Sequence, residues 1–159
     1  MNFLMWVEGT SLAEYIRVSA YGYPAMITLH ALGMAIMVGL SSVLCLRALG
    51  LFTAIPEGTL SKLLRIAWVG FGINILSGTA LFTTQATTYV TDREFIIKMT
   101  FVVLGGTFVA LLQNRVALSV RGGNATVATT EDSTARFYAY AALVSWLIAT
   151  IAGRLIAYL

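Results

Sequence analysis

The chain has 159 residues, of which 58% are hydrophobic and only 11% are charged, whereas about a quarter of the residues in an ordinary soluble domain are charged. This composition excludes a soluble globular protein and is typical of a multi-pass membrane protein. The net charge of +3 is interpreted by its position relative to the membrane and does not predict nucleic-acid binding. The single cysteine, Cys45, excludes an internal disulfide.

The first predicted element is a short amphipathic helix over residues 11–21. The preceding residues lack the positively charged start of a signal peptide, so we expect no cleaved leader. Ser11 and Glu14 fit the capping box that begins many helices. Leu12 and Ile16 fall on one face, opposite the charged residues. We therefore expect this helix to lie in the membrane interface.

Four apolar segments follow, each long enough for the roughly 20 residues that a membrane span requires. Pro24 suits the first turn of the first span, and Gly50 is a natural stop after it. Thr91 and Glu94 fit a second capping box at the start of the third span. The segment 85–91 is predicted to be a polar turn, and 121–133 a polar, mobile connection. The predicted spans are residues 24–49, 60–84, 92–120 and 134–158.

Small residues recur along each predicted span, where they allow helices to approach closely in lipid. Short connections favour neighbouring helices that run in opposite directions. The predicted fold class is therefore an all-α membrane protein, a four-transmembrane-helix antiparallel bundle with an N-terminal interfacial helix, forming a single membrane domain over residues 1–159. The small-residue stripes are Ala31-Ala35-Gly39, Gly70-Gly72-Ser77-Gly78, Gly106-Ala110 and Ser145-Ala149-Gly153.

Basic residues near the span ends predict the orientation, because they are more frequent on the cytoplasmic side. The connections between the first and second and between the third and fourth spans hold six basic residues. The opposite side, which carries both termini and the connection between the second and third spans, holds four. We therefore expect a bacterial inner-membrane protein with both termini periplasmic. The cytoplasmic set is Arg47, Lys62, Arg65, Arg115, Arg121 and Arg136, and the periplasmic set is Arg17, Arg93, Lys98 and Arg154.

His30 is the only histidine of the chain, and it lies inside the first predicted span. The helix rise places it roughly 9 Å below the outer end of that span. By the same helix rise, polar residues of the other spans lie at similar depths. Together with His30 they form a candidate ligand-binding layer. For His30 a structural hydrogen bond to a neighbouring helix, through Asn74, Ser77 or a backbone carbonyl, is at least as well supported as a ligand role. The other members of the layer are Asn74, Ser77, Lys98 and Arg154.

Lys98 and Arg154 have two interpretations. Each is close enough to a span end to extend its charge to the headgroups or to pair with a nearby carboxylate. Each could instead contact an anionic or carbonyl group of a ligand. The sequence does not decide between these roles.

The possible cofactors can be narrowed by counting ligands. One histidine cannot supply a bis-histidine haem, and too few ligands are present for tetrahedral zinc. Met26 and Met34 lie four residues to either side of His30, so these three side chains form a weak candidate copper(I) site. Methionine is also a common filler of apolar helix faces. No nucleophile with a base and no nucleotide motif is found, so we do not expect an enzyme.

The segments YPAMITLHALGMAIMVGLSSVLCLRALG, LLRIAWVGFGINILSGTALF, FIIKM and AGRLIAYL occur in this order along the chain. In these four segments the chain resembles a family of small bacterial four-helix inner-membrane proteins that is defined only as a domain of unknown function. The start of the third span and the end of the second are more remotely similar to the membrane domain of copper-resistance D proteins. This chain lacks the further histidines of such metal-handling proteins. The resemblance implies the topology and no activity.

Three functions are compatible with these features. The first is an accessory or structural subunit of a larger membrane complex, redox or energy-converting, with a protein partner or a second copy in the bilayer. The second is a carrier of a small solute or copper that uses the polar layer. The third is a protein that holds haem, quinone or another lipophilic cofactor, with His30 as ligand or hydrogen-bond donor.

Overall fold

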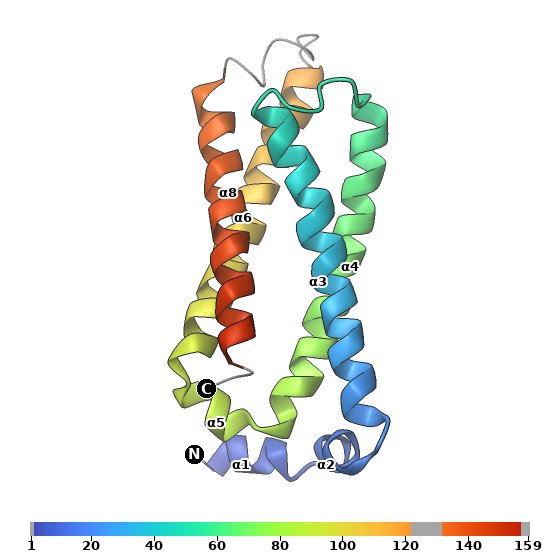
Figure 1. The fold of residues 1–159 in the computed structure, drawn as a ribbon, viewed down its shortest axis with the longest axis vertical. Coiled ribbons are helices and arrows are strands. Elements are labelled where there is room, and N and C mark those ends of the chain that lie inside the picture. The colour runs from blue at the N-terminus through green and yellow to red at the C-terminus, as the bar shows by residue number, and fades with distance from the viewer. Residues whose placement is uncertain (1, 122–131, 157–159) are drawn as a thin grey trace. The chain divides into compact units, whose positions relative to one another are not determined.

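The computed structural model describes residues 2–121 and 132–156, and every regular element in these two ranges is a helix (Figure 1). Four of the helices, α3, α4, α6 and α8, are long and apolar enough to cross a membrane. The all-helical class and the four candidate spans are therefore confirmed. The helices are α1 (Asn2–Glu8), α2 (Ser11–Val18), α3 (Gly22–Ala48), α4 (Glu57–Thr84), α5 (Ala86–Thr91), α6 (Arg93–Arg121) and α8 (Ser133–Leu155).

The boundaries of the spans agree with the predicted ranges to within a few residues. At the starts, α3 begins at Gly22 and not at residue 24, and α4 begins at Glu57 and not at residue 60. At the other end of the chain, α8 ends at Leu155, and the predicted end of the fourth span at residue 158 lies outside the described residues. The predicted stop at Gly50 is confirmed, since its φ is +93°. The Gly50 N–H donates to the carbonyl of Arg47, and the N–H of residue 51 donates to that of Leu46. This pattern is a Schellman motif, which requires the left-handed backbone that glycine adopts without strain.

The predicted polar turn over residues 85–91 is wrong, because this segment contains helix α5. The Oγ1 of Thr91 donates to the carbonyl of Thr88 at 2.9 Å, inside α5, so Thr91 does not cap α6. A threonine hydroxyl can bond back to the preceding turn in this way, and a polar composition therefore does not prevent a helix. Thr91 is instead the last residue of α5.

The start of α2 also differs from the prediction. Its N-cap is Thr10, whose Oγ1 accepts from the N–H of Ala13 at 3.4 Å, and Ser11 is the first helical residue. The helix ends at Val18, before the predicted residue 21, because Ser19 has an extended backbone. Helix α1 was not predicted. The predicted mobile connection over residues 121–133 falls almost wholly outside the described residues.

Contacts within the chain divide it into two compact units. The first unit comprises Met1–Val38 and Arg65–Arg93, and the second comprises Gly39–Leu64 and Glu94–Leu159. Helices α3 and α4 each continue from one unit into the other. Each unit is described by itself, and the single membrane domain stays a prediction.

In the first unit, Glu8 at the end of α1 holds the start of α5. Its Oε1 accepts from both the backbone N–H and the hydroxyl of Thr87, each at 2.7 Å. The first N–H groups of a helix lack partners within the helix, and Gln85 at the N-cap provides no side-chain bond. A carboxylate from α1 therefore caps α5, and α1 and α5 lie side by side (Figure 1). These hydrogen bonds from Thr87 lower the pKa of Glu8 below its ordinary value of 4.5.

In the second unit, α6 and α8 pack through small residues. A Cβ atom built at Gly105 would lie 3.1 Å from the indole ring of Trp146. Ser145 and Ala149 of the predicted α8 stripe are buried, at 4% and 1% exposure. The Nε1 of Trp146 is buried and has no hydrogen-bond partner in the described part of the chain. Trp146 therefore contacts Gly105 by van der Waals packing, because its ring fills the space that a side chain at residue 105 would occupy.

The connection between α3 and α4 is organised by Arg47. Its Nη1 donates to the carbonyl of Thr53 at 3.0 Å and also to the carbonyl of Ile55. An arginine in the last turn of a helix can satisfy loop carbonyls while its charge interacts favourably with the helix dipole. The side chain that was counted for the orientation thus also shapes the turn.

Candidate functional site

Helices α3 and α4 approach closely in the first unit, where each carries a glycine. A Cβ atom built at Gly33 of α3 would lie 2.7 Å from the backbone nitrogen of Asn74 and 2.7 Å from the carbonyl oxygen of Gly70. One built at Gly70 would lie 2.6 Å from Cγ2 of Ile36. Carbon atoms cannot come that close to these atoms, so this helix separation requires both glycines. The close contact places the next turn of α3 directly against α4.

His30 lies in that next turn and forms reciprocal hydrogen bonds with Asn74. Its Nδ1 is 3.0 Å from the backbone carbonyl oxygen of Asn74. In return, Nδ2 of Asn74 donates to the backbone carbonyl of His30 at 2.8 Å. Asn74 is buried, with 9% exposure, and His30 is half-buried. The side chain of each residue thus bonds to the backbone of the other, and the two helices are joined within the apolar spans.

The partner of Nδ1 determines the tautomer of His30. A backbone carbonyl only accepts hydrogen bonds, so Nδ1 must carry the proton that it shares with Asn74. The side-chain groups near Nδ1 are farther away, at 3.3 Å for Nδ2 of Asn74 and 3.4 Å for Oγ of Ser77. In the neutral imidazole Nε2 then carries the lone pair. This nitrogen can bind a metal or accept a hydrogen bond, and it cannot donate one.

Ser77 and Gly78 fix the position of the imidazole ring. The hydroxyl of Ser77 donates to the carbonyl of Ile73 at 2.6 Å, which directs its proton away from the ring. A Cβ atom built at Gly78 would lie 2.9 Å from Cε1 and 3.1 Å from Nδ1 of His30. The ring therefore rests on bare backbone at this point of α4. This support resembles that of metal-binding histidines, whose second nitrogen is usually held by a carbonyl or carboxylate.

The structure brings three of the five predicted layer residues together, namely His30, Asn74 and Ser77. Lys98 and Arg154 belong to the second unit, and they are described there. The stem of Lys98 packs on α8, since its Cδ and Cε lie 3.4 and 3.5 Å from a Cβ atom built at Gly153. Arg154, the next residue, is exposed. A common layer of all five residues stays a prediction.

The methionines next to His30 have different environments. Met26 lines a pocket near the start of α3, and Met34 is half-buried. Within residues 2–121 and 132–156, no three His, Cys, Asp or Glu side chains gather into a possible metal site. Cys45 is buried in the second unit. The copper site of Met26, His30 and Met34 is therefore still an expectation from their spacing.

Sequence reasoning left Asn74, Ser77 and a backbone carbonyl open as hydrogen-bond partners of His30, and it did not single out the carbonyl of Asn74. It also missed the role of Gly78 and the bond between Glu8 and Thr87. A signal for the first two is present, because residues 70, 74, 77 and 78 fall on one face of α4 at helical spacing. No comparable pattern connects Glu8 with Thr87, which is 79 residues away.

No family model, no curated protein and no solved structure matches the chain. The resemblance to a family of four-helix inner-membrane proteins thus stays a prediction, and the site is interpreted by its own geometry.

Proposed function

We propose that this protein holds a lipophilic cofactor of the haem or quinone class within the membrane, with His30 as the binding residue. The observation that carries this proposal is the hydrogen bond from Nδ1–H of His30 to the backbone carbonyl of Asn74. In its neutral form, an imidazole that donates from Nδ1 would offer Nε2 as a ligand or acceptor, inside a long apolar helix. An ionisable residue within a span is costly to insert and usually has a functional role.

The tautomer narrows the chemistry of the ligand. Haem iron would be held by the Nε2 lone pair of His30, and because the chain has one histidine, any further ligand would come from Met99, from a methionine on another helix, or from a residue of a partner or second copy. A quinol hydroxyl would donate to Nε2, whereas a quinone carbonyl could not. In its neutral form His30 would therefore accept from the ligand, and as an imidazolium it would donate to the ligand.

The test begins with full-length protein purified from native membranes in mild detergent. A visible spectrum before and after reduction, metal analysis and mass spectrometry of the organic extract would identify a haem, a metal or a quinol. We expect His30→Gln to lose the bound molecule and the matched variant Thr28→Val to retain it, since Thr28 lies one turn away and bonds only to the carbonyl of Pro24. A colourless wild-type protein without metal or quinol would refute the proposal.

The accessory-subunit function is a second candidate, and a different observation supports it. Ala31, Ala35 and Gly39 lie at four-residue spacing on α3, and all three are exposed. A Cβ atom built at Gly39 would meet no other atom within 4 Å. Small-residue stripes in membranes are typical helix-docking faces, and a partner helix could pack here. Native gels would test this, because Ala35→Leu should convert a discrete large complex into free protein, while Leu32→Ala should not.

We propose further that the four spans form an antiparallel bundle in a bacterial inner membrane, with both termini periplasmic. The excess of basic residues in the connections between the first and second and between the third and fourth spans supports this orientation. Single cysteines introduced at Gln85 and Thr53 in a Cys45→Ser background would test it. A membrane-impermeant maleimide should label the first in intact cells and the second only after lysis.

A further inference from the structure

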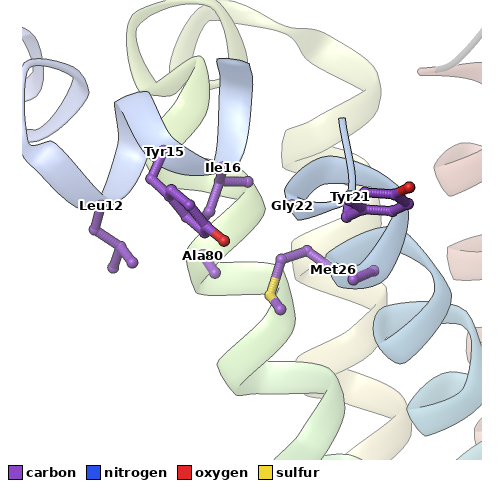
Figure 2. A pocket seen from close by; sticks show the side chains of 8 residues that line it. Leu12, Tyr15, Ile16, Tyr21, Gly22, Met26 and Ala80 are labelled. Carbon is purple, nitrogen blue, oxygen red and sulfur yellow. The ribbon is translucent and has the colours of Figure 1, made fainter. Parts of the chain in front are cut away.

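A pocket of about 330 Å³ lies in the first unit, where helix α2 covers the outer ends of α3 and α4. Figure 2 shows Tyr15 and Ile16 on α2 directed toward Ala80 on α4, with Met26 of α3 extending across below them. The remaining lining is Leu12 together with residues 21, 22 and 25. Among the described residues that line the pocket none is charged, and the only polar side-chain groups are the hydroxyls of two tyrosines.

The position of the pocket determines which molecules can reach it. Its walls are the ends of two candidate membrane spans and the apolar side of α2, while Glu14 and Arg17 of α2 are exposed. Such a helix lies at the membrane surface with its apolar face toward the acyl chains. If the helices span the membrane as proposed, the pocket is at the depth of the upper acyl chains, next to Leu12 and Tyr15, which are 59% and 66% exposed.

The shape and lining indicate one kind of occupant. A volume of about 330 Å³ is at the lower end for ligand sites, which favours one thin hydrocarbon chain. An uncharged lining offers nothing to a phosphate or a metal. Tyrosine side chains suit the boundary between acyl chains and headgroups, where the ring is in the apolar region and the hydroxyl meets water or an ester.

We propose that this pocket binds one acyl chain of a membrane phospholipid and holds α2 against the spans. The site is separate from the hydrogen bonds of His30 and does not depend on the cofactor. Met26 is the flexible wall of the pocket, and Ala80 is the small residue that leaves room for the chain.

The test uses full-length protein in nanodiscs of phosphatidylethanolamine and phosphatidylglycerol that contain a phospholipid with a diazirine in one acyl chain. After irradiation, peptide mass spectrometry measures the labelling of Met26. We expect Ala80→Phe to fill the pocket and to reduce this labelling at least fivefold. The matched control Leu76→Phe introduces the same ring at an exposed position of α4, one turn before Ala80, and should leave the labelling unchanged.

Equal labelling of Met26 in the wild type and in Ala80→Phe would overturn the proposal, because the lipid would then only surround the protein. Loss of labelling on addition of an isoprenoid quinone at a low molar ratio would also overturn it, and would assign the pocket to the quinone. If circular dichroism shows that Ala80→Phe is unfolded, Ala25→Phe, which fills the pocket from α3, replaces it with the same expected fivefold loss.

Discussion

The contact between Gly33 and Gly70 offers the sharpest test of how the site is held together. Adding a single methyl group in Gly33→Ala would place a carbon 2.7 Å from two backbone atoms of α4 and 3.1 Å from Cα of Asn74. Ordinary contacts begin near 3.4 Å, so α3 and α4 must separate by several tenths of an ångström. Backbone atoms cannot move aside as a flexible side chain would.

The expected cost follows from the groups that this separation disturbs. Overpacking of a close contact costs about 1–3 kcal/mol. The reciprocal hydrogen bonds of His30 and Asn74, at 3.0 and 2.8 Å, lie one turn away and would weaken, each being worth about 1 kcal/mol. Alanine is the better helix former by about 1 kcal/mol, which offsets part of the loss. We expect a net destabilisation of about 2 kcal/mol.

Unfolding in mixed micelles with increasing SDS, followed by circular dichroism, would measure this free energy. Gly39→Ala and Gly72→Ala are matched controls, because a Cβ atom at either position meets no other atom within 4 Å. Both controls should be neutral or slightly stabilising. If Gly33→Ala were as stable as these controls, the close approach of the two helices would be wrong.

Three further outcomes are expected. The pKa of Glu8 is lowered in the folded protein, so its carboxylate stabilises the α1–α5 contact above pH 4.5, and this stabilisation is lost as the pH falls through the folded-state pKa. Glu8→Gln should abolish this pH dependence, and hydrogen exchange of the Thr87 amide would measure it. Asn74→Leu should lower the free energy of unfolding by about 1 kcal/mol. The backbone carbonyl of residue 74 remains in this variant and can still accept from Nδ1 of His30, so the imidazole ¹⁵N NMR spectrum should stay the same. A changed spectrum would contradict this expectation. Arg47→Lys should lower the exchange protection of the α3–α4 connection about tenfold, since lysine lacks the planar fork.

The depth argument grouped polar residues of α3 and α4 that lie in contact in the structure. A constant rise of 1.5 Å per residue relates position to depth in every helix, so residues at equal depths on neighbouring helices can be matched without a structure. His30, Asn74 and Ser77 were grouped in this way. Depth does not give the rotation of a helix about its axis, and so it could not show that His30 meets a backbone carbonyl in preference to a side chain.

The sequence by itself determined the four long apolar helices that could cross a membrane, and the position of the single histidine in the first of them. Hydropathy and length are local properties of a segment, and lipid leaves a long apolar stretch no alternative to a helix. Only the tertiary structure decided which group lies next to Nδ1 of His30, since the carbonyl of Asn74 belongs to a residue 44 positions away. It also decided that Glu8 caps α5 and that α2 encloses a pocket, because both depend on the close approach of distant segments, which local sequence patterns do not encode.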